Sequence, residues 1–136
     1  MKKMTLSIAI LVLITFAFWM INRPNNQSAG TITIQVIDVS ANIVVNDHHA
    51  FNEGDSLFDI LNQHYNLICA NALYRPDASC DAQHWGRVIL SIDDVHTDWN
   101  TTFLHLTVNG EHSHLGVDSV RIKDKDIIQF TVQKPN

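Results

Sequence analysis

The sequence predicts an α+β domain, with one helix packed on a mixed β-sheet, behind an apolar N-terminal segment. Three observations support this prediction. Apolar and polar residues alternate in several short stretches, which is typical of half-buried strands. Residues 57–68 instead repeat their apolar residues at helical spacing. The dipeptide Asn109-Gly110 joins two alternating stretches, and this pair is typical of the type I′ turn of a β-hairpin.

The N-terminal segment is apolar from Met4 to Ile21, behind Lys2 and Lys3. About 18 apolar residues are the minimum for a helix that spans a bilayer, and the run is long for a signal peptide. We therefore expect residues 1–22 to be an uncleaved signal anchor, with a cleaved signal peptide as the alternative. Both interpretations keep the lysines in the cytoplasm and the following residues outside the membrane, anchored or secreted.

Residues 23–30 are a polar linker, and residues 31–134 form the predicted domain. The net charge of −5 argues against nucleic acid and against an anionic membrane surface as partners, so only the N-terminal helix is expected to meet the membrane. The motifs of serine hydrolases, zinc proteases and phosphate-binding loops do not occur in the sequence. Composition and motifs thus predict a non-catalytic protein.

The predicted domain begins with two strands, at Thr31–Val39 and Ile43–Val45. A polar break at Asn46–Ala50 follows the second strand. An amphipathic helix of about three turns comes next, with Asp55 or Ser56 as its N-cap.

The segment Leu67–Trp85 has little periodicity and contains both cysteines, Cys69 and Cys80. Outside the cytoplasm two cysteines are expected to form a disulfide. Free thiols, or half of a metal site, are the alternatives, although the spacing is too wide for a CxxC pair. Further strands are predicted at Arg87–Ile92 and Ile127–Val132, on either side of the hairpin.

The Asn-Gly turn fixes the register of the predicted hairpin. The expected cross-strand pairs are Val108 with Glu111, Thr107 with His112, Leu106 with Ser113, and His105 with His114. Because strand side chains alternate between faces, one face should be apolar and should meet the core. That face carries Leu104, Leu106, Val108 and Leu115, and the opposite face carries His105, Thr107, His112 and His114.

Two groups of residues are candidate sites. His105, His112 and His114 would bind Zn²⁺ or Cu²⁺, sense pH or ligate a corrinoid cobalt if their imidazoles converge; otherwise they are a solvated polar face. Trp85, Trp99 and Phe103 flank irregular segments. Exposed, they would bind a flat apolar ligand or a protein partner together with His105; buried, they would belong to the core.

A family resemblance adds to these observations. It rests on Phe51, Gly54-Asp55-Ser56-Leu57, Val88, Ser91-Ile92, Trp99, Val108-Asn109-Gly110, Gly116 and Lys123-Asp124 with Asp126-Ile127. In this order the motifs resemble the transcobalamin-like C-terminal domain family over residues 31–133. The resemblance implies a β-grasp-like domain that binds a ligand or is displayed on a cell surface, and not an enzyme.

These observations lead to three functional hypotheses. The first is an extracytoplasmic module that binds a cobalamin-like cofactor or another small molecule and hands it to a transporter. The second is a surface module for protein–protein interaction or adhesion. The third is metal binding by the hairpin histidines.

Overall fold

The structure is a computed structural model that describes residues 2–21 and 29–135. Helix α1 (Lys2–Ile21) covers the apolar N-terminal segment. Across the described ranges, no helix has both the length and the apolarity that crossing a bilayer requires. The anchor or signal peptide at residues 1–22 stays a prediction, and most of the linker lies outside the described residues.

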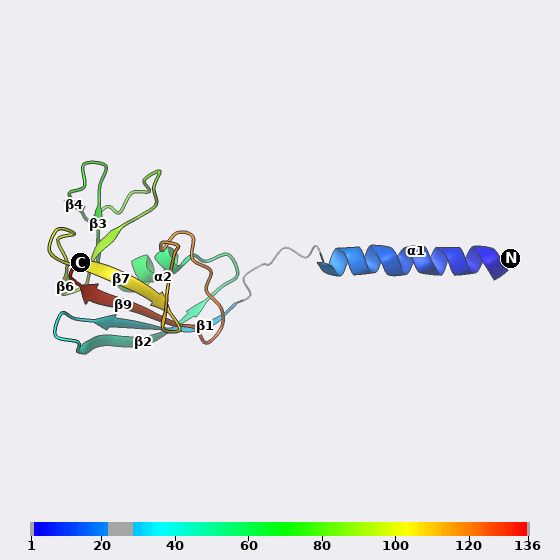
Figure 1. The fold of residues 1–136 in the computed structure, drawn as a ribbon, viewed down its shortest axis with the longest axis horizontal. Coiled ribbons are helices and arrows are strands. Elements are labelled where there is room, and N and C mark those ends of the chain that lie inside the picture. Colours follow the sequence, from blue (N-terminus) through cyan, green and yellow to red (C-terminus); the bar gives the residue numbers. More distant parts are fainter. Residues whose placement is uncertain (1, 22–28, 136) are drawn as a thin grey trace.

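The larger of two sheets has five strands in the order β2-β1-β9-β7-β8 (Figure 1). Strands β1 (Gly30–Ile37) and β9 (Ile127–Gln133) are parallel, and every other pairing in this sheet is antiparallel. The remaining strands are β2 (Ile43–Phe51), β7 (Phe103–Val108) and β8 (Glu111–His112). The predicted α+β class with a mixed sheet is therefore confirmed.

The second sheet is antiparallel, in the order β4-β3-β5-β6, and the sequence analysis missed it. Its strands are β3 (Leu67–Ala70), β4 (Pro76–Asp77), β5 (Ile89–Ile92) and β6 (Val95–His96). The segment expected to be irregular thus contains two strands. Of these strands only β5 lies within a predicted one, at Arg87–Ile92; most side chains of β3 are buried, so it does not show the alternation by which a half-buried strand is recognised.

Helix α2 (Leu57–His64) begins where predicted but is shorter. The Ser56 hydroxyl accepts from the Asp59 amide, and the Asp59 carboxylate accepts from the Ser56 amide, so both residues form a capping box. The predicted third turn is wrong because Tyr65 is already extended, with φ −131°. From Tyr65 the chain passes into β3.

The predicted break at Asn46–Ala50 is also wrong, because β2 runs through it without interruption. The polar side chains find partners on both faces of this edge strand. Thr33 and His48 share a hydrogen bond of 2.8 Å across the β1–β2 pair, and the Gln35 amide donates to Asn46. Polar residues thus continue the strand where a sequence pattern alone indicates a loop.

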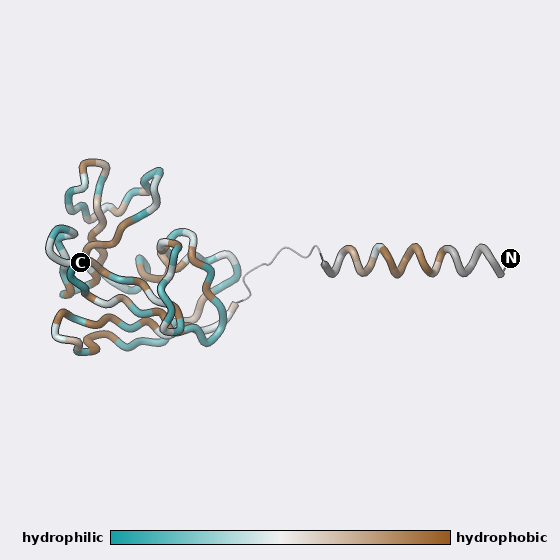
Figure 2. Tube along the Cα trace, in the orientation of Figure 1, coloured by the Kyte–Doolittle hydropathy of each residue, from teal (hydrophilic) through white to brown (hydrophobic). Residues whose placement is uncertain are grey.

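The core of the domain joins apolar side chains of both sheets with the buried face of α2. Figure 2 shows hydrophobic residues concentrated on the strands, while several connecting loops are hydrophilic. The predicted disulfide between Cys69 and Cys80 is present, with its Cα atoms 5.0 Å apart. It links β3 to the loop after β4.

Candidate functional site: a hollow beside the β7–β8 hairpin

The hairpin turn forms as predicted. Asn109 and Gly110 both have positive φ, at 52° and 83°, and the pairs of Val108 with Glu111 and Thr107 with His112 are confirmed. The Asn109 side chain also donates to the Asp126 carboxylate and accepts from the Ile127 amide. The turn is therefore fixed to the start of β9.

The hairpin is shorter than predicted, because β8 ends at His112. The Ser113 amide still donates to the Leu106 carbonyl, but the Ser113 hydroxyl bonds the backbone of Leu115 in a local turn. This turn takes the chain away from β7. Leu115, expected in the core, is therefore 53% exposed.

The expected pairing of His105 with His114 is wrong for the same reason. His105 instead lies beside His112: His105 Nε2 and His112 Nδ1 are 2.6 Å apart. The two rings are nearly parallel, at 8°, with centroids 4.7 Å apart, and His114 meets His112 edge-on at 5.0 Å. Burial, and then the proximity of His112, lowers the pKa of His105. Within the described residues, no three His, Cys, Asp or Glu side chains are arranged to hold a metal ion.

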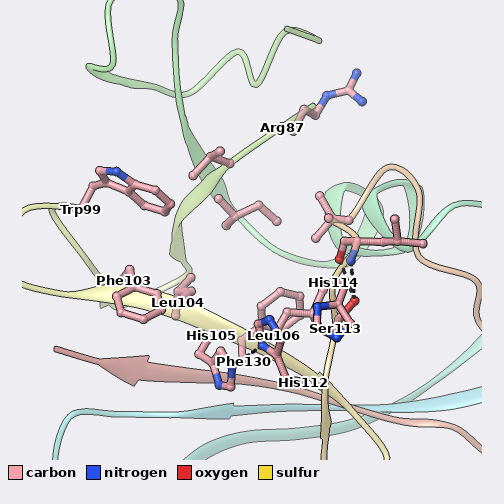
Figure 3. A pocket seen from close by; sticks show the side chains of 15 residues that line it. Arg87, Trp99, Phe103, Leu104, His105, Leu106, His112, Ser113, His114 and Phe130 are labelled. Atoms are coloured by element: carbon pink, nitrogen blue, oxygen red, sulfur yellow. Dashed lines mark hydrogen bonds between the residues drawn. The ribbon is translucent and has the colours of Figure 1, made fainter. Parts of the chain in front are cut away.

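A hollow of about 260 Å³ lies beside the hairpin and includes these histidines in its lining (Figure 3). Its other lining is mainly apolar. Trp99 and Phe103 lie at one end, with ring centroids 6.3 Å apart, and Leu104 and Leu106 come from β7. The buried ring of Phe130 on β9 also contributes. The hollow thus combines an apolar surface with imidazole nitrogens.

Trp99 is held in an unusual conformation at the mouth of the hollow. Its φ is +67°, a value that costs a non-glycine residue free energy, and its side chain is 52% exposed. The Asp98 carboxylate accepts from the amides of the three residues 100–102, and these bonds lower the pKa of Asp98 to about 2.

Arg87 also borders the hollow, but its charge is engaged elsewhere. Its guanidinium pairs with Asp118, donates to the Cys80 carbonyl and lies 3.9 Å from the centre of the Phe58 ring. In Figure 3 the guanidinium points away from the hairpin. The hollow therefore keeps a neutral apolar character on this side.

Of the four residues predicted to bind a ligand, the structure brings Trp99, Phe103 and His105 together. Trp85 is not among the residues that line the hollow. Its ring stacks on that of Tyr74, with centroids 5.4 Å apart. Trp85 is 38% exposed, so it is not a core residue, and it lies on a different part of the surface from Trp99 and Phe103.

A second histidine cluster escaped the sequence analysis. The Tyr65 hydroxyl donates to Asp47, so the hydrogen of the 2.6 Å bond between His49 Nε2 and Tyr65 must come from the imidazole. The His49 ring also stacks on His64, with centroids 4.1 Å apart. Burial, and then His64, lowers the pKa of His49, while burial and the Asp47 bond raise the pKa of Tyr65. The network ties the end of α2 to β2.

Comparisons with known proteins place the fold. The sequence profile of the family described as "Domain of unknown function (DUF4430)" matches residues 54–134, while no curated protein matches the chain significantly. A candidate metal-binding protein from Ruminococcus gnavus ATCC 29149 has a similar structure, with a TM-score of 0.57 at 18% identity, over 79% of this chain and 99% of that chain.

Haptocorrin, in a complex with Cbi, is also similar, with a TM-score of 0.58 at 13% identity. The match covers 82% of this chain but only 27% of haptocorrin, so most of haptocorrin has no counterpart in the match. At these identities the likeness shows the fold alone. It agrees with the transcobalamin-like resemblance of the sequence, and both neighbours are described by what they bind and not as enzymes.

Proposed function

We propose that this chain, which belongs to the DUF4430 family, is a non-catalytic binding module that holds one face of a small molecule in the hairpin hollow. The observation that carries the proposal is the convergence of exposed Trp99 with Phe103 and the hairpin imidazoles on one concave surface. A concave apolar surface with a few polar groups is the usual form of a small-molecule site.

The apolar part of the hollow favours a ligand with a flat face. Aromatic side chains bind such faces through area burial and ring stacking. Trp99 is half-exposed and its backbone strain is maintained by the Asp98 turn, which supports a role in contact rather than in folding. Phe103 and Leu104 would extend the contact surface along β7.

A corrinoid is the first ligand to test, because the haptocorrin structure contains Cbi and the sequence resembles the transcobalamin-like family. The hollow of about 260 Å³ lies below the usual range of roughly 300–1,000 Å³ for ligand pockets. It therefore suits one face or edge of such a macrocycle and not the whole molecule. The residues that would meet it are Trp99, Phe103 and His105, whose imidazole is also a possible cobalt ligand.

The place of action that we propose is the extracytoplasmic side of the membrane. The disulfide between Cys69 and Cys80 is typical of that environment. Attached through residues 1–22, the domain would present its ligand to a transporter in the same membrane.

Equilibrium dialysis of the full-length protein with cobinamide and cobalamin, read from the corrin absorption band, tests this proposal. We expect saturable binding that Trp99→Ala weakens by about tenfold or more, since it removes most of the exposed aromatic surface. Trp85→Ala is the matched control, because it removes the same residue type outside the hollow. This variant should bind the corrinoid as tightly as the unaltered protein does. No binding at high micromolar ligand, or equal loss in both variants, would overturn the corrinoid assignment.

A second candidate function is recognition of another protein, as in adhesion. A specific observation favours it: Leu73 and Tyr74, at the tip of the β3–β4 loop, are 71% and 73% exposed, and Trp85 stacks beside Tyr74. A Leu73→Ser/Tyr74→Ser variant would lose attachment to cells or surface proteins, while binding in the hollow would be unchanged. Attachment that survives this change would exclude the loop as the contact surface.

A further inference from the structure

We propose that His105 and His112 form a binding site for a divalent transition-metal ion such as Zn²⁺ or Cu²⁺, with His114 as a third donor. The proposal goes beyond small-molecule binding in the hollow and rests on a different observation. That observation is the direct contact of two imidazole nitrogens, His105 Nε2 and His112 Nδ1, at 2.6 Å.

The contact brings two metal-ligating atoms to face each other. At 2.6 Å, with rings only 8° from parallel, one nitrogen carries the proton and the other presents its lone pair. If that proton moves to the outer nitrogen of its own ring, both facing nitrogens present lone pairs and no net charge changes. A metal ion can then take the place that the proton occupied.

Only a small movement is needed to admit the ion. A tetrahedral ion with Zn–N distances near 2.0–2.1 Å separates two donor nitrogens by about 3.3 Å, so the rings would part by about 0.7 Å and turn until their lone pairs converge on the ion. His112 is exposed, while His105 is half-buried. His112 can thus supply the movement without disturbing the core.

The backbone beneath the two rings is fixed. His105 is paired with Thr131 on β9, and His112 with Thr107 on β7. The Asn109 side chain in addition binds the turn to the backbone of β9 at Ile127. Sites on paired strands hold their ligands in place better than sites on loops, so little ordering entropy is lost when the ion binds.

The third donor is close enough to join. The ring of His114 meets that of His112 edge-on at 5.0 Å, and His114 is exposed in the turn that follows β8. In the structure its ring does not converge with the other two. A side-chain rotation would complete a site of three imidazoles and water, which is the ligand number of an open zinc site.

The surroundings are uncharged on the side of β9. In the antiparallel register, the neighbours of His105 on its face are Thr131, Gln129 and Gln133. Arg87 across the hollow is paired with Asp118, while Arg121 and Lys123 line an adjoining hollow together with Glu111 and His112. An imidazole binds a metal ion in its neutral form, so protons compete with the ion for the same nitrogens on acidification.

Isothermal titration of the full-length, tag-free protein with Zn²⁺ and Cu²⁺ near neutral pH tests the proposal. A mild detergent keeps the apolar N-terminal segment dispersed. We expect one ion per chain with a micromolar Kd, weakened by about tenfold or more in His105→Gln and in His112→Gln, and by a smaller factor in His114→Gln. Binding should also weaken at about pH 5.5, where protons compete for the same nitrogens.

His96→Gln is the matched control, since it removes a histidine that lies on β6 of the second sheet and does not line the hollow. It should bind the metal as the unaltered protein does, and circular dichroism should show each variant folded. Trp99→Ala should also retain metal binding, so loss of the corrinoid and loss of the metal are distinguishable. The proposal is overturned if the unaltered protein shows no saturable binding, or if the His105 and His112 variants bind as tightly as it does.

Discussion

The β7–β8 hairpin and the disulfide-linked loop between β3 and β5 expose aromatic residues by different means. In the hairpin region, the sheet beneath the exposed groups is anchored by the buried Phe130 ring and by the Asn109 side chain. In the loop, the tip is shaped by the Asn71 side chain, which accepts from the amides of Leu73 and Arg75. The disulfide between Cys69 and Cys80 holds the base of the loop.

The difference teaches that the sheet under the hairpin is part of the cooperative core, whereas the loop joins that core only at its base. Residues of β7 and β9 belong to, or pack against, the core cluster. The tip of the β3–β4 loop is exposed, whereas the cross-linked Cys69 and Cys80 at its base are buried in the core cluster. A change in the hairpin sheet should therefore affect the whole domain, whereas a change in the loop should stay local.

The largest expected effect tests this difference directly. Phe130→Ala should lower the free energy of unfolding by roughly 3–5 kcal/mol, because it leaves a cavity under β7 where the ring is 2% exposed. Tyr74→Ala, at 73% exposure, should change it by less than about 0.5 kcal/mol. Urea unfolding followed by circular dichroism measures both. Equal effects of the two changes would contradict the distinction.

Removal of the disulfide should have the next largest effect. The double change Cys69→Ser with Cys80→Ser should lower the free energy of unfolding by about 3 kcal/mol, because the cross-link closes a short loop and restricts the unfolded chain. Hydrogen exchange should report faster opening of residues 69–86, and protection of β7 and β9 should fall only with the global stability. If β7 and β9 instead opened together with the loop, the two regions would form a single unit.

Asn109→Ala should lower the free energy of unfolding by about 1–2 kcal/mol. The buried Asp126 carboxylate and the Ile127 amide each lose a hydrogen-bond partner, and the turn loses a residue that tolerates positive φ. Metal binding by the hairpin should weaken as well, because the positions of His105 and His112 depend on the turn. Thermal unfolding and zinc titration measure the two effects. An unaltered zinc Kd would show that the turn does not position the rings.

Acidification should have a smaller effect, with a defined sign. The pKa values of His49 and His105 are lowered from 6.5 in the folded state, so the unfolded chain binds more protons below this pH. Their contribution to stability is present above about pH 6.5 and is lost as the pH falls through the folded-state values. His49→Gln and His105→Gln should each flatten the curve of unfolding free energy against pH. A steeper curve in either variant would reverse the sign that we infer.

Much of the fold follows from local sequence features. The start of α2 and the hairpin turn depend on short-range chemistry, namely Ser56 with Asp59 and Asn109 with Gly110, and both were predicted. The extent of β2 and the end of α2 were not predicted. They depend on partners far along the chain, such as Thr33 for His48 and Asp47 for Tyr65, which periodicity does not reveal.

The candidate site was only partly predictable for a similar reason. Alternation placed His105 and His112 on one face, but their contact requires β8 to end early, which depends on the hydrogen bonds of Ser113 with Leu115. The exposure of Trp99 follows from its positive φ in the Asp98 turn, and the sequence does not specify that conformation. Trp85 was grouped with Trp99 because both are aromatic residues that flank irregular segments.

The parallel pairing of β1 with β9 has a consequence for the order of folding. Gln35 and Gln129, bonded across these strands, are 94 residues apart, so the central pair of the larger sheet joins the two ends of the domain. The sheet cannot close until the last strand has been synthesised. Pairing over such a distance is slow to form, which leaves a nascent chain unfolded for longer. This order of events is compatible with the extracytoplasmic location that we propose, where the domain would fold after β9 has emerged.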